Sequence, residues 1–514
     1  AIGFNALNQQ NSDSNNETTG NVGIGVEAGF YNQTGQYNTL IGTGAGLGAS
    51  GQSNNNNTAL GYSALNVVTT GSHNVVIGRS SGDAVTDGSY NVFMGYYAGS
   101  TTTSAQRTVA IGSEALETGN HDQDGTVAIG SKALQRLTTG VGNVAIGLEA
   151  NGNVTTSSWN TVIGYKALSS GTASANNNTA IGFEAGRYLG DDGTSNHSSF
   201  NTIIGRKAMG GGNTSDATLN TAHLNIAIGH HAVGGSTGTG TALTATHNTA
   251  IGYASMSIIE NGVENSSLGF GALQSITSGT DNTAIGYNSG NAITTSQYNT
   301  LVGNNSGSLI TTGWNSVMIG YATGDAIVDS HKHTLVGAGA GGNADITTDG
   351  AVAVGYTALA DVTVGTCVGV GFEAGKDNST GGNNVFVGYK AGHSGSGDVT
   401  DGQANVIIGS EATANASGAI NRIAIGRTAT AVADNSVTLG NANVTAVYMA
   451  QDAGATVYGA KPQWADSSKK YYKIVGSKSL TAGSATDFIV SGHSHNYTIQ
   501  VWCDSTNKGM MSTK

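Results

Sequence analysis

The chain has one proline, Pro462, and two cysteines, Cys367 and Cys503, among its 514 residues. Two cysteines are too few for a disulfide scaffold and say little about redox compartment. Proline cannot donate a backbone hydrogen bond to a β-ladder, so its scarcity is compatible with long unbroken ladders. No apolar run has the length of a membrane-spanning helix, and no signal-peptide pattern is present. We therefore expect neither a disulfide framework nor insertion into a membrane.

Charge is also scarce, since only 10% of the residues are charged and the net charge is −12. Phosphate binding requires a basic surface, so this balance argues against a nucleic-acid partner. Hydrophobic residues make up 38% of the chain, which is too much for a disordered linker. The composition therefore points to an ordered protein with another kind of partner.

Glycine, in contrast, is abundant, with 80 residues, and much of it belongs to a repeat. The segment 282–290 reads NTAIGYNSG and the segment 299–307 reads NTLVGNNSG. The same unit, N-[TV]-x-[ILVM]-G-x-x-[AS], recurs at intervals that are mostly 17 or 18 residues. Its glycine stands at 3, 25, 42, 61, 78, 95, 112, 130, 147, 164, 182, 205, 229, 252, 269, 286, 303, 320, 337, 355, 371, 388, 409, 426 and 440. One repetitive architecture therefore occupies most of the chain.

Each unit has a five-residue core that is rich in β-branched residues and too short for a helix. About two short strands and two turns in 17 residues describe one coil of a parallel β-solenoid. We therefore predict an all-β fold, with a solenoid shaft of about 24 coils over residues 1–440. Coils stacked about 4.8 Å apart would give a length on the order of 115 Å.

Side-chain alternation divides each strand into two faces. The positions three and one before the glycine, such as Thr283 and Ile285, are almost all β-branched, and we expect them to line the interior of the coil. The central position, such as Ala284 or Phe386, is apolar but varied in size. A strand that is apolar on both faces needs cover on both, so we expect this second face to pack against another chain.

Two sets of residues are expected to build the coil interior. Asparagine stands four places before the glycine in 16 of 24 readable cases, and stacked asparagines would satisfy turn backbone groups from coil to coil. The residues chosen for this structural ladder are Asn21, Asn38, Asn74, Asn91, Asn143, Asn282 and Asn299, together with Ile77, Ile146 and Ile285. Alanine three places after the glycine is expected to turn into a narrow core.

The repeats resemble the heads of YadA-type trimeric adhesins, as in TVAIGSEAL (108–116), NVAIGLEA (143–150) and NSVTLGNAN (435–443). These heads are left-handed parallel β-rolls in trimers, so the resemblance implies a homotrimer. The repeats followed by residues 435–459 also resemble bacteriophage tail-fibre proteins. The longer coils depart from the adhesin pattern. The C-terminus, which has neither a heptad stalk nor a membrane anchor, also departs from it, and this second difference favours the phage alternative. Because the chain opens within the motif and without Met, we expect an N-terminal portion to precede it.

Familiar catalytic and ligand motifs do not fit the repeat. Glycine-rich pieces at 42–48 and 337–342 are followed by neither a helix nor the Lys-Ser/Thr of a phosphate loop, and the calcium-binding nonapeptide is absent. No nucleophile–histidine arrangement and no pair of carboxylates recurs. We expect no enzymatic activity and no cofactor, although carboxylates brought together between chains would permit a depolymerising spike enzyme.

Three long coils in a row interrupt the regular spacing between Gly182 and Gly252. Their extra residues fall within 187–200, 210–224 and 234–248. The segment contains five of the twelve histidines, namely His197, His223, His230, His231 and His247. A tolerated surface elaboration is the simpler interpretation, and a lateral binding patch for a glycan or a protein is the functional one.

The repeat stops near the C-terminus, where residues 441–462 are expected to form a transition and cap, and 463–514 a small β domain. Its aromatic residues are candidate receptor-binding groups at a fibre tip, although a core needs aromatics too. They are Trp464, Tyr471, Tyr472, Tyr497 and Trp502. The sequence GHSHN also places His493 and His495 on one face of a strand. In a trimer, the three copies of this pair would offer six imidazoles to a transition metal. The alternative is that both histidines are ordinary exposed surface residues.

The sequence thus predicts a homotrimeric fibre of the virion tail that binds a host surface glycan or protein receptor and contacts other virion tail proteins. A bacterial trimeric surface adhesin, or another extracellular filament protein, is the alternative.

Overall fold

The computed structural model describes residues 1–11, 19–119, 124–170, 175–190, 198–210, 220–234, 243–393, 395 and 397–447. All of them belong to the first of two compact units, Ala1–Val447; the second unit is Tyr448–Lys514. The described residues form 24 short strands. The first twelve are β1 (Val22–Ile24), β2 (Thr39–Ile41), β3 (Thr58–Leu60), β4 (Val75–Ile77), β5 (Val92–Met94), β6 (Val109–Ile111), β7 (Val127–Ile129), β8 (Val144–Ile146), β9 (Thr161–Ile163), β10 (Thr179–Ile181), β11 (Thr202–Ile204) and β12 (Ile226–Ile228). The others are β13 (Thr249–Ile251), β14 (Ser266–Leu268), β15 (Thr283–Ile285), β16 (Thr300–Val302), β17 (Val317–Ile319), β18 (Thr334–Val336), β19 (Val352–Val354), β20 (Val368–Val370), β21 (Val385–Val387), β22 (Val406–Ile408), β23 (Arg422–Ile425) and β24 (Ser436–Leu439).

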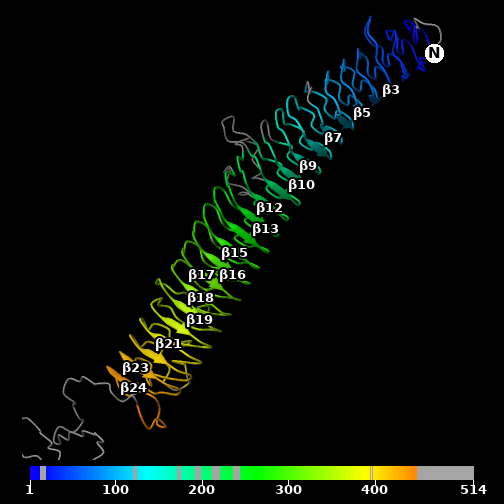
Figure 1. Ribbon diagram of the computed structural model, residues 1–514. Coiled ribbons are helices and arrows are strands. Elements are labelled where there is room, and N and C mark those ends of the chain that lie inside the picture. The colour runs from blue at the N-terminus through cyan, green and yellow to red at the C-terminus, as the bar shows by residue number, and fades with distance from the viewer. Residues whose placement is uncertain are drawn as a thin grey trace, which may run out of the picture. The chain divides into compact units, whose positions relative to one another are not determined.

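Each strand pairs in parallel with the strands before and after it in the sequence, so that one 24-stranded sheet runs along the stack of coils (Figure 1). The register joins equivalent positions of consecutive repeats, as in Thr283 with Thr300 and Ile285 with Val302. The all-β solenoid and the 17-residue spacing predicted from the sequence are confirmed.

The glycine that ends each strand is required by the stacking itself. Gly61 has a φ of +140°, and a Cβ on it would lie 2.5 Å from the carbonyl oxygen of Gly78 in the next coil. Both the backbone conformation and the close approach exclude a side chain. This explains why the glycine recurs in every repeat.

The core of each coil comes from three positions of the repeat. The central strand residue points inward, as Leu301 does, and is joined by the alanine three places after the glycine, such as Ala272. In most of the 17-residue coils an aliphatic residue seven places after the glycine, such as Ile276 or Ile293, completes the core. The expectation that the alanine turns into a narrow core is therefore confirmed.

The expectation for the two strand faces is wrong. The central residue is the buried one in β1–β22, whereas its two neighbours are half-buried or exposed. Ile285 is 41% exposed, and Ile77 and Ile146 also lie on the outer face. Alternation shows that the two sets oppose each other but not which set faces inward. The varied size of the central residue reflects packing inside the coil, and the uniform β-branched face is the outer one.

The asparagines four places before the glycine are hydrogen-bonded from coil to coil. Asn282 Oδ1 accepts from the backbone N–H of Asn299 at 3.2 Å, and Asn282 Nδ2 donates to the carbonyl of Ser296 at 2.8 Å. Asn38 donates its backbone N–H to Asn21, Asn91 to Asn74 and Asn160 to Asn143 in the same way. Each amide therefore satisfies a buried backbone donor and a buried acceptor.

His333 occupies the asparagine position in one coil and preserves the pattern. Its Nδ1 accepts from the backbone N–H of Ala351 at 3.2 Å, and its Nε2 lies 2.8 Å from Ser330 Oγ. The Nδ1 acceptor role requires a neutral ring with its proton on Nε2. Burial lowers the pKa of His333 to about 4, so that the ring stays neutral at pH 7.

Candidate assembly surface and shaft groove

The outer face of the sheet is an apolar surface that runs along the coils. It consists of the first and third residues of β1–β22 with the last residues of β23 and β24, and we refer to it as the outer strand face. Members that are exposed by more than a third include Val22, Ile24, Leu60, Val75, Ile163, Ile204, Ile226, Leu268, Ile285, Val317, Ile319, Val354, Val370 and Ile425. Strand side chains of this kind are usually covered on a soluble protein.

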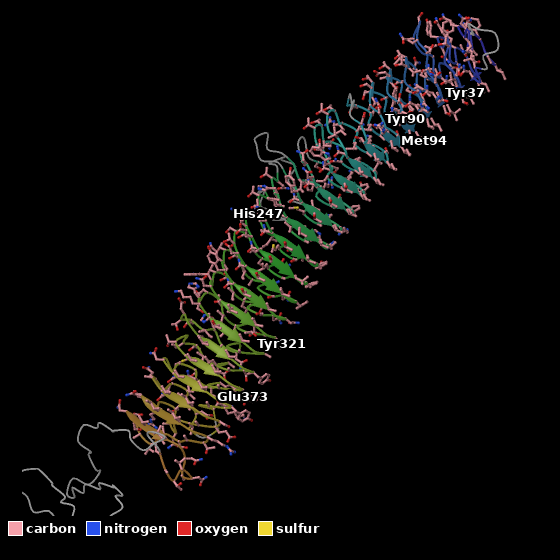
Figure 2. The ribbon with its side chains drawn as sticks, viewed as in Figure 1. Tyr37, Tyr90, Met94, His247, Tyr321 and Glu373 are labelled. Carbon is pink, nitrogen blue, oxygen red and sulfur yellow. The ribbon has the colours of Figure 1, made fainter. Side chains whose placement is uncertain are left out.

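Aromatic side chains extend this surface immediately after the glycine. Tyr253, Phe270 and Tyr287 stack in consecutive coils, with ring centroids 4.9 and 5.2 Å apart and interplanar angles of 6° and 14°. A second column consists of Tyr356, Phe372 and Tyr389. All six rings remain substantially exposed. Figure 2 places Met94, at the end of β5, and Tyr321, just after β17, along the side that carries the strands.

A shallow groove lies between consecutive coils on another part of the shaft. Its volume is about 290 Å³, and we call it the shaft groove. Tyr298 and Trp314 supply aromatic faces to it, and His331 and Lys332 of the next coil lie against Trp314, with centroid distances of 4.9 Å from the imidazole and 5.2 Å from Lys332 Nζ. The polar residues that line it are Thr295, Ser296, Gln297 and Thr312. Exposed rings beside hydroxyl and amide groups suit the stacking of a sugar.

The histidines of the long coils form two separate pairs rather than one cluster. The rings of His230 and His231 are 4.3 Å apart, and those of His223 and His247 are 6.2 Å apart. Burial, followed by the charge of Arg206, lowers the pKa of His230. Burial and neighbouring cations also lower the pKa of His231. Protonation of His230 and His231 is therefore disfavoured beside the cations Arg206 and Lys207. His197 lies outside the described residues.

The residues predicted for the C-terminal tip also lie outside the described residues. They are Trp464, Tyr471, Tyr472, Tyr497 and Trp502, with the metal candidates His493 and His495. Their roles remain predictions.

Sequence reasoning missed the aromatic columns and the shaft groove. An aromatic residue directly follows the repeat glycine in 12 of 25 cases, and that count would have identified the columns. The groove had no such signal, because Trp314 stands one place out of frame with Tyr298.

Comparison of the chain with protein-family models, with curated proteins and with solved structures found no match. Within the described part of the chain, no helix is both long and apolar enough to span a lipid bilayer. The arguments for function therefore rest on the surfaces described above.

Proposed function

We propose that the chain forms the shaft of a homotrimeric fibre that belongs to a bacteriophage tail and attaches the virion to a host surface. The observation that supports this proposal most is the outer strand face, on which Ile, Leu, Val or Met stands at the third position of every strand from β1 to β22, beside Val, Ile, Thr or Ser at the first. A solenoid of one chain has no further element with which to cover it among the described residues.

The size of the outer strand face suits an obligate interface. Twenty-four strands at about 4.8 Å and three residues of width give roughly 110 Å by 10 Å, or about 1,100 Å². A stable interface buries about 800 Å² per partner, whereas the largest apolar patch on a monomer is typically about 300–600 Å².

The periodicity of the face indicates which partner covers it. A partner must present matching apolar side chains at the same coil spacing over the full length, and a second copy of the chain does so by construction. Packing about an axis parallel to the stack gives every copy the same environment and closes the assembly. The number three follows from the resemblance to the trimeric adhesin heads.

Host attachment in this proposal is non-covalent. The shaft groove offers aromatic faces and polar groups to a surface glycan, and the predicted C-terminal tip offers further aromatics. Other virion tail proteins would bind the end of the fibre that is opposite the C-terminal tip. A bacterial trimeric adhesin or extracellular filament is the alternative, and a phage structural gene cluster around the coding sequence would decide between them.

The first experiment is the native molar mass by light scattering, with a parallel test of resistance to SDS without boiling. We expect about three times the chain mass of 51.4 kDa and a band that dissociates only on heating. A stable monomer would contradict the proposal.

Variants can locate the interface on the outer strand face. Ile285→Lys with Ile319→Lys places two charges at exposed positions of that face, and we expect it to weaken the trimer. Asn261→Lys, an exposed change between β13 and β14, is the matched control and should leave the mass unchanged. Equal behaviour of the two variants would place the interface elsewhere.

A further inference from the structure

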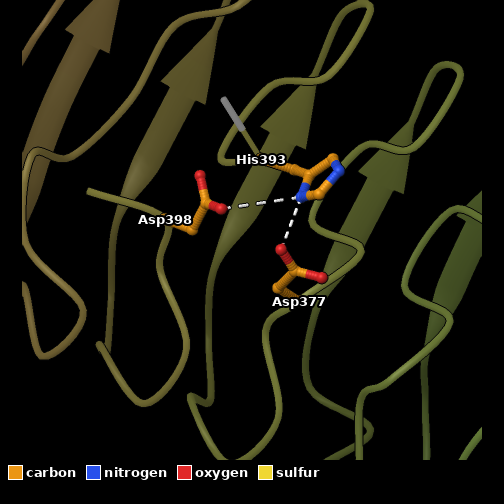
Figure 3. A group of neighbouring side chains, drawn as sticks. All are labelled: Asp377, His393 and Asp398. Atoms are coloured by element: carbon orange, nitrogen blue, oxygen red, sulfur yellow. Dashed lines mark hydrogen bonds and ion pairs between the residues drawn. The ribbon is translucent and has the colours of Figure 1, made fainter. Parts of the chain in front are cut away.

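Three side chains from two consecutive coils converge near the C-terminal end of the described shaft (Figure 3). Asp377 follows β20, and His393 and Asp398 follow β21. His393 Nδ1 lies 2.5 Å from Asp377 Oδ2 and 3.7 Å from Asp398 Oδ2. One ligand atom of each residue lies within 4.8 Å of the others. All three side chains are partly buried, His393 and Asp398 more than Asp377.

We propose that Asp377, His393 and Asp398 bind a divalent transition-metal ion of the Zn²⁺ class. One imidazole nitrogen and two carboxylate oxygens are donors that Zn²⁺ accepts, at about 2.0–2.2 Å. The imidazole distinguishes the site from an all-oxygen calcium or magnesium site. Three protein ligands leave a fourth position for water or for a group on a bound partner.

The charges around the cluster favour a dication. Asp377 and Asp398 carry two negative charges, and His393 contributes none when it is neutral and coordinates through Nδ1. The third nearby carboxylate, Glu373, is paired with Lys390 at 3.3 Å and with Lys376 at 3.5 Å. A divalent ion would place two positive charges between the two aspartates.

The surroundings also orient the ligands. Glu373 Oε2 lies 3.6 Å from His393 Nε2, on the side of the ring away from the two aspartates. A carboxylate beyond a metal-binding imidazole fixes its tautomer and raises its basicity. The backbone N–H of Gly395 donates to Asp398 Oδ1 at 2.9 Å, while Oδ2 is the oxygen that faces His393.

A proton shared between His393 and Asp377 is the competing occupant of this space. Two ligands of a tetrahedral Zn²⁺ are roughly 3.0–3.5 Å apart, so metal binding requires His393 and Asp377 to separate by under about 1 Å. The metal ion and this proton therefore cannot occupy the space at the same time.

The test is calorimetric titration of the full-length, metal-free protein with ZnCl₂ at pH 7.5. We compare the wild type with His393→Gln and Asp398→Asn. Asp361→Asn is the matched control, because Asp361 has the same place in the preceding repeat but Lys376 stands where the next coil has His393. Zn²⁺ binding elsewhere, for example at His493 and His495, is common to all four proteins and cancels in the comparison.

We expect the wild type and Asp361→Asn to bind one more Zn²⁺ per chain than His393→Gln and Asp398→Asn. Glu373→Gln should retain the site with an affinity about tenfold lower. Circular dichroism of each variant without metal verifies the β-solenoid. Equal stoichiometry and affinity in all the variants, with the fold intact, would overturn the proposal. The result does not depend on the oligomeric state, because one chain supplies all three ligands.

Discussion

The ring of Phe93 fills the space beside Gly99 inside the same coil, where a Cβ on Gly99 would lie 2.9 Å from the Cδ1 atom of the ring. The same two positions of the repeat also complement each other in size in other coils. A large central strand residue is followed by glycine in Leu40 with Gly46 and Met318 with Gly324. A small one is followed by a large residue in Ala59 with Leu65. In these coils, core volume is therefore balanced between two positions six residues apart.

This complementarity predicts a coupled pair of substitutions. Gly99→Leu should destabilise its coil by about 3 kcal/mol, because it adds a side chain to a full core at a φ of +61°. Phe93→Ala should cost about 3–5 kcal/mol through the cavity it leaves. The double variant Phe93→Ala/Gly99→Leu reproduces the arrangement of Ala59 and Leu65. We expect a coupling on the order of 2 kcal/mol in urea unfolding, and strict additivity would contradict the pairing.

The asparagine hydrogen bonds predict a local effect of Asn282→Ala. The substitution leaves the N–H of Asn299 and the carbonyl of Ser296 without their side-chain partner. We expect a loss of about 2–4 kcal/mol and faster hydrogen exchange at the Asn299 amide. Asn261→Ala, at an exposed position, is the control. Unchanged protection at Asn299 would mean that the side-chain amide is dispensable.

His333 predicts a loss of stability in mild acid. The unfolded chain protonates this histidine near pH 6.5, whereas the folded chain does so only near pH 4. The unfolded state therefore binds more protons between these values, and stability falls as the pH decreases through that window. The total is on the order of 3 kcal/mol. After correction for the intrinsic rate, hydrogen exchange at the Ala351 amide should become faster as the pH is lowered from 7 to 4.5.

His333→Asn separates this effect from general acid sensitivity. Asparagine restores the usual repeat residue and does not titrate, so the pH dependence at Ala351 should disappear. Retention of the full pH dependence in this variant would assign it to another group.

The shaft groove predicts binding of a glycan if the fibre attaches to a sugar. Trp314→Ala and Tyr298→Ala should each weaken binding on a glycan array by about tenfold, which corresponds to about 1.4 kcal/mol of lost stacking. Tyr37→Ala is the matched control, since Tyr37 has the same place in the repeat as Tyr298 and is equally exposed. A glycan that binds all three variants like the wild type would place attachment outside the groove.

The repeat allowed the fold to be predicted from the sequence, but it did not show which face of each strand points into the coil. Period, strand position and the buried alanine follow from the spacing around residues such as Gly269. Alternation alone does not distinguish inside from outside, and the volume compensation between Phe93 and Gly99 was the signal that decides it. The cluster of Asp377, His393 and Asp398 was hidden because its members occupy unlike places in two coils, the second of which is longer than the usual repeat. Their proximity depends on how the coils stack.

The repeat glycine of each coil stacks directly on that of the next coil, as Gly61 does on Gly78. This register determines how the length of the solenoid can change. Because each coil bonds only to its two neighbours through equivalent atoms, removal of one whole unit brings together surfaces that already match. Deletion of the 17 residues 283–299 would shorten the stack by about 4.8 Å and leave the core continuous. A shorter deletion that removes Thr283–Ile285 without the rest of the unit would instead take one strand out of the sheet and leave its loop behind. Insertion or removal of whole repeats therefore changes the length of the stack in steps of about 4.8 Å and leaves the fold of every other coil as it is.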